Sequence, residues 1–159
     1  MDEKLWQFVD AIGTWAAKAY GMPQMTGRVL GWLLVCDPPE QTAAQLAEAL
    51  GASKGSISGA TSMLVRIRLL ERLHIRGERA DRFRIRPEAW DDQVRDQGTD
   101  EARALLAQGL EALEHESPAR RARLEELDAF YAWYQSRMAA LYDEWQHYKR
   151  ATLGGRRDG

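Results

Sequence analysis

The sequence has one cysteine, Cys36, in 159 residues, so an internal disulfide and a cysteine-based zinc site are both excluded. Its longest apolar run with at most one glycine, residues 29–36, is far shorter than the roughly 20 residues that a membrane-spanning helix needs. The first residues, Met-Asp-Glu-Lys, lack the pattern of a signal peptide. We therefore expect a soluble, cytoplasmic protein that does not bind membranes.

Signals of catalysis and of metal binding are also scarce. The three histidines, His74, His115 and His147, are not spaced as metal ligands, so no metal and no cofactor is expected. The segment 51–55, Gly-Ala-Ser-Lys-Gly, matches the G-x-S-x-G motif of hydrolases, but that motif needs a strand before the serine. A helix is predicted there instead, and the chain has too few strands for the parallel sheet. We therefore do not expect an enzyme.

The net charge of −2 conceals an uneven distribution. Between residues 52 and 86, nine basic residues stand against Glu71, Glu78 and Asp81, which gives a local charge of +6. The segment 91–159 is acidic. A basic segment flanked by acidic ones is typical of a surface that binds a polyanion.

The spacing of apolar residues predicts four helices in the first half of the chain, over 2–20, 24–36, 42–50 and 54–70. The second is apolar nearly all round and should be central. Thr42 and Gln45 have the spacing of a capping box at the start of the third helix. Gly51 then separates the third helix from the fourth, for which Ser53 is the expected N-cap.

The periodicity changes after the fourth helix. Leu73 and Ile75 alternate with basic residues, and so do Phe83 and Ile85, which predicts a β-hairpin with one apolar and one cationic face. No other segment is typical of a strand. Further helices are expected from Pro87 to about residue 115 and from residue 118 to about 150, followed by a disordered tail over 151–159.

The last helix carries an apolar pattern of the a/d type over more than three heptads. Its members are Leu124, Leu127, Tyr131, Tyr134, Met138, Leu141, Trp145 and Tyr148. Such a seam needs a partner, which could be other helices of the same chain. We favour a second copy, because those helices are too few to cover the seam together with Phe130 and Trp133.

A short capped helix, a turn with glycine, a second helix and a basic hairpin are the order of a winged helix-turn-helix. On the helix over 54–70, apolar residues lie on one side and small polar residues on the other, where hydroxyls could reach base edges in a DNA major groove. The arginines of the hairpin could bind the minor groove and the backbone. The predicted DNA-contacting residues are Ser53, Lys54, Gly55, Ser56, Ser58, Ser62, Arg66, Arg79, Arg82 and Arg84.

These segments also resemble a protein family. The stretch 26–38, the segment 46–50 with Ser53, Ile57 and Ser58, and the segment 77–87 are similar to a subgroup of MarR-type transcriptional regulators from actinobacteria. That subgroup includes repressors of MmpS/MmpL-type lipid-efflux transporters. The resemblance spans roughly residues 24–145.

The resemblance implies a homodimeric repressor that binds a palindromic operator and is released by a small apolar or amphipathic ligand, with an efflux or transport operon as its target. The expected fold is mostly α with a small β-hairpin. It comprises a winged helix-turn-helix domain over 23–87 and a helical dimerisation domain from 1–22 and 88–150. The expected partners are double-stranded DNA, a second copy of the chain and an effector.

The effector site is expected in a cleft between the two domains. Its candidate residues are Trp15, Trp32, Trp90, Tyr131, Tyr134 and Met138. Core or dimer packing is the competing interpretation for each of them. Cys36 could sense oxidants, although its position at the end of an apolar helix favours a buried, inert thiol. The alternative function is a winged-helix module that binds protein and senses no ligand.

Overall fold

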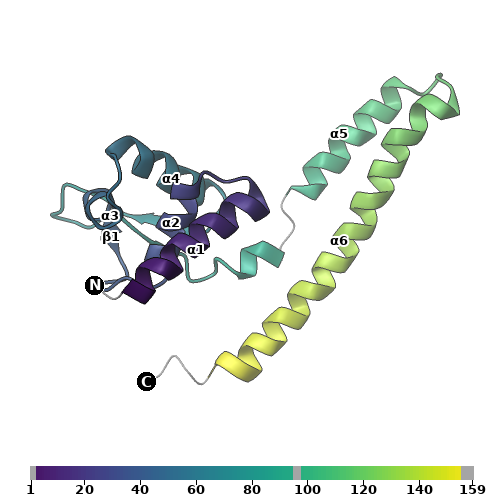
Figure 1. Cartoon of the computed structure of the whole chain (residues 1–159). Coiled ribbons are helices and arrows are strands. Elements are labelled where there is room, and N and C mark those ends of the chain that lie inside the picture. The colour runs from purple at the N-terminus through teal and green to yellow at the C-terminus, as the bar shows by residue number, and fades with distance from the viewer. Residues whose placement is uncertain (1–2, 95–97, 155–159) are drawn as a thin grey trace. The chain divides into compact units, whose positions relative to one another are not determined.

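A computed structural model describes residues 3–94 and 98–154 of the chain, which forms two compact units, residues 1–89 and 90–159. The first unit contains α1 (Glu3–Tyr20), α2 (Gln24–Leu33), β1 (Gln41–Thr42), α3 (Ala43–Leu50), α4 (Lys54–Arg66), β2 (Leu70–Leu73) and β3 (Arg82–Ile85) (Figure 1). The second contains a 3-10 helix, η1 (Asp91–Val94), and the helices α5 (Thr99–Ala112) and α6 (Pro118–Leu153). The predicted mostly helical fold with a small β-hairpin is confirmed.

The core of the first unit is built around α2, as its apolar sequence predicts. All residues from Val29 to Leu33 are buried. The apolar side chains among them form one cluster with Leu46 and Leu50 of α3 and with Ile57 and Leu64 of α4. The core therefore fixes α4 with its apolar side inward and its small polar side outward.

The helix α1 packs on α2 in the same unit, and glycines permit a close approach. A Cβ atom on Gly27 would lie 2.8 Å from the Cβ of Ala16 and 2.8 Å from the Cα of Gly13. Since the second of these atoms is backbone, no larger residue fits at position 27 without moving a helix.

Both helices of the predicted helix-turn-helix have the expected caps. The hydroxyl of Thr42 accepts a hydrogen bond from the backbone N–H of Gln45 at 3.2 Å, and the side chain of Gln45 accepts one from the N–H of Thr42 at 2.8 Å. Gly51 ends α3 in the left-handed region, with a φ of 59°. The hydroxyl of Ser53 then accepts from the N–H of Ser56 at 3.1 Å and starts α4.

Two helices are shorter than predicted. The helix α2 ends at Leu33, three residues before Cys36, in a turn that precedes two prolines. The helix α4 ends at Arg66 and does not continue to residue 70. Arg68 has a φ of 62°, and the N–H of Leu69 donates to the carbonyl of Leu64, which is the closing pattern of a Schellman motif. The chain is thereby free to begin β2 at Leu70.

The hairpin is present, but its faces differ from the prediction. In the sheet order β1-β3-β2, Arg72 pairs with Phe83 and Leu73 pairs with Arg82. Paired residues share a face, so Arg72 lies on the side of the buried Phe83, and its guanidinium carbon is 5.3 Å from the ring centre. In β2, the side chain that faces the core is that of Leu70, which is buried, rather than that of Leu73. The strand β1, which pairs with β3, was not predicted.

The second unit also departs from the prediction at its start. In place of one helix from residue 87 to 115, it has η1 and then α5. The break occurs where Gly98 adopts a φ of 88° before α5 begins, while the side chain of Asp91 is bound by α6.

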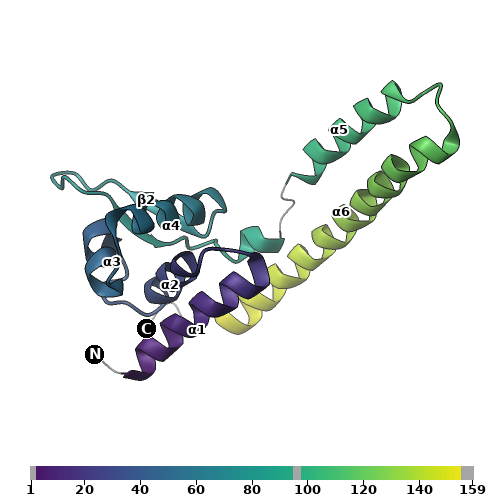
Figure 2. The same ribbon diagram turned by 45° about the horizontal axis from the view of Figure 1, so that its top comes forward.

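The helices α5 and α6 run alongside one another as a hairpin (Figure 2). Arg103 of α5 donates to Asp128 of α6 at 2.8 Å. The helix α6 begins at the predicted Pro118 and continues to Leu153, slightly beyond its predicted end, whereas residues 155–159 of the predicted tail lie outside the described residues. Within residues 3–94 and 98–154, no helix is both long and apolar enough to cross a membrane.

Candidate nucleic-acid interface

The outer side of α4 carries six of the ten predicted DNA-contacting residues, and all six are exposed. They are Lys54, Gly55, Ser56, Ser58, Ser62 and Arg66, preceded by the exposed N-cap Ser53. On the opposite side, Ile57, Ala60, Thr61 and Leu64 are buried. The structure therefore brings these seven residues together on one accessible surface.

Glycine leaves the middle of this surface open. A Cβ atom on Gly59 would have no heavy atom within 4 Å, so neither folding nor packing requires glycine at this position. An interior helical glycine costs up to about 1 kcal/mol relative to alanine. Its use here fits a surface that another molecule approaches closely.

A shallow hollow of about 330 Å³ lies beside these glycines. Gly55, Gly59 and Arg66 line it from α4, and Met25 lines it from the start of α2. The surface of α4 is therefore recessed between small residues and bordered by one cation.

The hydroxyls at the start of α4 are ordered by the cap. Ser53 accepts from the N–H of Ser56, and its own hydroxyl donates to the hydroxyl oxygen of Ser56 at 3.0 Å. The proton of Ser56 is then available for a further acceptor. Thr61, on the buried side, donates to the carbonyl of Ile57 at 2.8 Å and so needs no outside partner.

The wing is the loop between β2 and β3 with the ends of both strands, and it carries Arg79, Arg82 and Arg84. Arg82 makes two hydrogen bonds to Glu78, at 2.8 and 3.0 Å. Hydrogen bonding from Arg82, together with its charge, holds the pKa of Glu78 below its ordinary value. Arg84 is paired with Glu71 and also with Glu40, which directly precedes β1. Arg79 is exposed at the far end of the loop.

The six residues predicted for an effector site fall into both units. Trp32 is 92% buried in the first unit, where it stacks on Trp6 with ring centres 5.4 Å apart, so it is part of the core. Trp15, also in the first unit, is 51% exposed and meets Tyr20 edge to face. The other four belong to the second unit: Trp90, which is exposed, and the half-buried Tyr131, Tyr134 and Met138 of α6.

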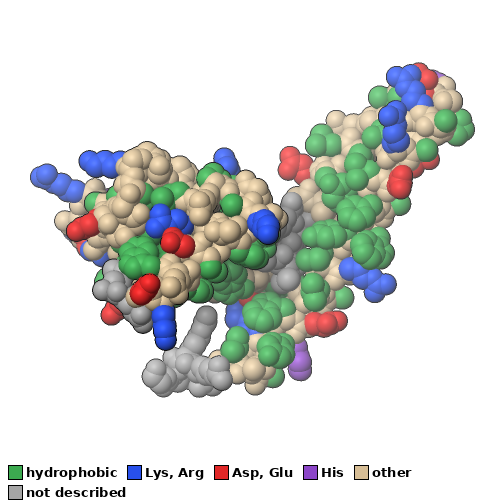
Figure 3. All heavy atoms as spheres, in the orientation of Figure 1, with side chains coloured by type: hydrophobic (Ala, Val, Ile, Leu, Met, Phe, Trp, Pro, Cys, Tyr) green, Lys and Arg blue, Asp and Glu red, His purple; other side chains and the backbone are tan. Residues whose placement is uncertain are grey.

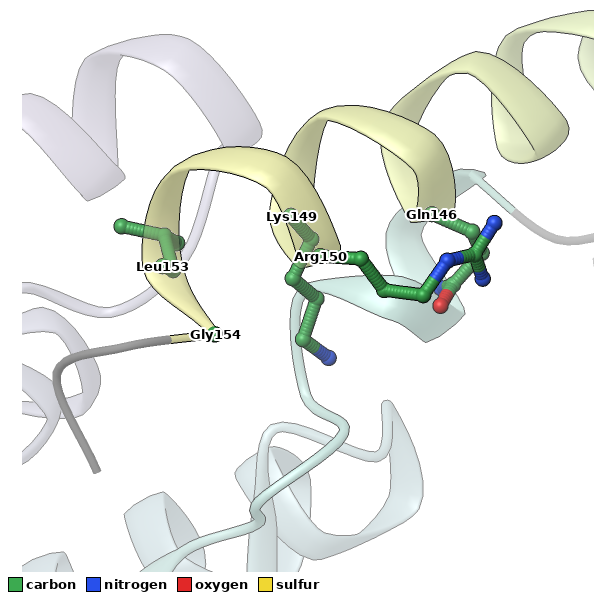
Figure 4. Close-up of a pocket in the computed structure, with 5 residues that line it drawn as sticks. All are labelled: Gln146, Lys149, Arg150, Leu153 and Gly154. Carbon is green, nitrogen blue, oxygen red and sulfur yellow. The ribbon is translucent and has the colours of Figure 1, made fainter. Parts of the chain in front are cut away.

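A further hollow of about 270 Å³ lies at the end of α6. Figure 4 labels its lining residues, which include Gln146, Lys149 and Arg150. The ammonium group of Lys149 is already bound to Asp91 at 2.8 Å, so it is not free for a ligand. In the described part of the chain, no three His, Cys, Asp or Glu side chains gather as metal ligands would.

Cys36 is half-buried. Burial raises the pKa of its thiol, and the neighbouring carboxylate of Asp37 raises it further. Because the thiolate is the form that reacts with oxidants, this environment favours an unreactive side chain.

Comparisons with known proteins agree with this architecture. Residues 88–148 match the family model of the MmpR5-like MarR family transcriptional regulators. The HTH-type transcriptional regulator MmpR5 of Mycobacterium tuberculosis (strain ATCC 25618 / H37Rv) is 37% identical over 132 residues, which cover 82% of this chain and 79% of that protein. A crystal structure of a transcriptional regulator superposes with a TM-score of 0.79 at 32% identity and covers 91% of this chain and 99% of the other.

The structure has a winged helix-turn-helix whose second helix is capped and exposed. A relative that is 37% identical covers most of both chains. Both observations lead to the same family. Relatives of this kind regulate transcription and are not enzymes, so the match of 51–55 to the hydrolase motif arises by chance, as a helix precedes Ser53. The chain belongs to the MmpR5-like MarR family of transcriptional regulators.

Proposed function

We propose that the chain acts as a homodimeric repressor that binds a palindromic operator. The helix α4 enters the major groove, and the wing lies against the adjacent minor groove and backbone. The observation that carries this proposal is the exposed side of α4, where small polar and cationic residues surround an unobstructed Gly59.

The predicted contacts divide into two classes. Ser56, Ser58 and Ser62 are short enough to meet base edges when the helix lies deep in the groove. Ser53, Lys54, Arg66 and Arg79 are placed to bind phosphates, and Gly55 allows the backbone to approach. Arg82 and Arg84 stay predicted contacts, although each already forms an ion pair, Arg82 with Glu78 and Arg84 with Glu71.

The apolar surface of α6 supports a dimer. None of its 36 residues, all of which are described, is buried. Leu127, Leu141 and Tyr148, from the predicted seam, are 41%, 46% and 57% exposed. Figure 3 shows hydrophobic side chains along this helix. A helix of a soluble protein rarely exposes such a long apolar stripe to water unless a partner covers it.

The helix α1 has a second uncovered stripe. Phe8, Ala11, Trp15 and Ala19 recur at helical spacing and are exposed, whereas Val9 and Ala16 of the same helix pack inward. We propose that α1 joins α5 and α6 in the dimer interface while its inner side stays on α2. This is consistent with a dimerisation domain over 1–22 and 88–150 beside a winged domain over 23–87.

The target and the effector are proposed from the family resemblance. An efflux or transport operon is the proposed target, and a small apolar or amphipathic molecule is the proposed effector. Its proposed contacts stay those predicted residues that are not buried in the core, which are Trp15, Trp90, Tyr131, Tyr134 and Met138. Titration of the bound DNA with fatty acids, lipids and hydrophobic antibiotics tests this, and an operator affinity that no compound changes would refute it.

The central experiment identifies the bound DNA and measures its affinity. Immunoprecipitation with sequencing should recover fragments with an inverted repeat, and fluorescence anisotropy should show affinity that falls steeply with salt. Arg79→Ala should weaken binding to every duplex, whereas Ser58→Ala and Ser62→Ala should change the preference at particular base pairs. Salt-insensitive binding, or none, would favour the alternative of a protein-binding module.

A further inference from the structure

The cations of the wing differ in whether a carboxylate already neutralises them. Arg82 is paired with Glu78, and Arg84 with Glu71 and Glu40. Arg72 lies 3.8 Å from Asp81, which also contacts His74 at 3.0 Å. Arg72, Arg82 and Arg84 are therefore balanced by carboxylates within the hairpin itself and by Glu40.

Arg76 and Arg79 differ from these three arginines. Both are exposed, and across residues 3–94 and 98–154 neither has a carboxylate within ion-pairing distance. The nearest acid in sequence, Glu78, stands between them but has both oxygens bound to Arg82. The end of the wing thus carries two uncompensated guanidinium groups.

The backbone explains where Arg76 lies. The N–H of Glu78 donates to the carbonyl of Ile75 at 3.0 Å, which closes a four-residue turn. Gly77 has a φ of 92°, and Arg76 is not among the described non-glycine residues with positive φ. This combination defines a type II β-turn with Arg76 at its first corner and Gly77 at its second.

A residue at the corner of such a turn projects away from the strands. Arg79 follows directly after the turn, so the two arginines flank Gly77 and Glu78 at the end of the loop. In Figure 3, basic side chains extend from the left-hand end of the first unit, where Figure 1 draws the loop between β2 and β3.

We propose that Arg76 is a further DNA-binding residue of the wing and that it binds backbone phosphate beside the minor groove together with Arg79. This inference rests on the proposed function and adds a residue to it. The pair of Glu78 with Arg82 ties the last residue of the turn to β3 and thereby helps to position both arginines. A guanidinium with no internal partner gives up no ion pair when it binds phosphate, unlike Arg82 and Arg84.

The test is a salt titration of binding to the recovered operator and to a short duplex of arbitrary sequence. Each phosphate contact contributes about 0.9 to the log–log slope, so Arg76→Ala should reduce the slope by about 1.8 in a dimer with both wings bound. Arg76→Lys should keep the slope, because it keeps the charge. Arg150→Ala, which removes one exposed cation from α6, is the matched control and should also keep it.

The outcomes separate the two proposals. A wild-type slope that is steep and unchanged in Arg76→Ala would overturn this inference and leave the DNA-binding function standing. A wild-type protein that binds neither duplex would overturn both. The melting temperature of Arg76→Ala should equal that of the wild type, since the side chain is exposed and makes no ion pair with the described residues, so a loss of slope would report on DNA contact.

Discussion

The ammonium group of Lys149 lies 2.8 and 3.0 Å from the two carboxylate oxygens of Asp91. The indole N–H of Trp145 donates to the same carboxylate at 2.7 Å. Only 8% of Asp91 is exposed, so these donors from α6 replace the water that its charge would otherwise need. One buried carboxylate thus attaches η1 to the last third of α6.

Replacing Asp91 with alanine should destabilise the second unit. The change leaves the indole and the ammonium group without their acceptor, which costs about 2 kcal/mol for partly buried donors. Denaturant unfolding should show this loss. Asp143→Ala, at an exposed position of α6, is the control and should change the free energy of unfolding little.

The same carboxylate should make stability depend on pH. Burial alone would raise the pKa of Asp91, but the hydrogen bonds from Lys149 and Trp145 outweigh it and hold the pKa below its ordinary value. A lowered pKa stabilises the fold above the ordinary value of about 3.9, and this contribution is lost as pH falls through the pKa of the folded state. The stability difference between the wild type and Asp91→Asn should therefore be full at neutral pH and shrink in acid. A difference that grows in acid would contradict this assignment.

Gly59→Ala should separate stability from DNA affinity. The new methyl group meets open space, and the helix gains up to about 1 kcal/mol from the loss of an interior glycine. The same methyl group should hold α4 away from the groove and weaken operator binding. The melting temperature should rise while affinity falls, and a variant with unchanged affinity would remove Gly59 from the interface.

Gly27→Ala is the counterpart on α2. Its Cβ would meet Ala16 and the backbone of Gly13 at 2.8 Å, so α1 must shift outward. We expect a loss of about 2 kcal/mol in the free energy of unfolding, as for an overpacked core. Because Gly59→Ala adds the same methyl group where space is open, the two variants form a matched pair in one denaturation experiment.

Leu141→Arg should disrupt the proposed dimer. Leu141 lies in the exposed apolar stripe of α6, and a charge there cannot be buried against a second copy without a large cost. Analytical ultracentrifugation should show monomers at concentrations where the wild type is dimeric. Asp143→Arg, on the opposite side of α6, should leave the dimer intact, and dimerisation that survives Leu141→Arg would place the interface elsewhere.

The parts of the fold that depend on local signals could be predicted from the sequence. Thr42 with Gln45, Gly51 and Ser53 fix the ends of α3 and α4 through hydrogen bonds that span three or four residues. The inner and outer sides of α4 follow from helical spacing alone. The prediction of the exposed surface of α4 succeeded for this reason.

The parts that depend on distant partners could not. Gln41 and Thr42 form a strand only because β3, some forty residues later, pairs with them. The interruption after Pro87 depends on donors at positions 145 and 149 that bind Asp91. The pairing of Arg84 with Glu40 likewise joins residues 44 positions apart, so the sequence alone shows the cations of the wing but not which of them are neutralised.

The lack of any buried residue along α6 has a consequence for the cell. In the proposed dimer, the second copy covers the stripe of α6, so each tenfold rise in protein concentration adds about 1.4 kcal/mol to the folding of the dimer. If this dimer forms, dilution would expose the stripe again and give proteases access to α6. The lifetime of the proposed dimer would then depend on its own abundance.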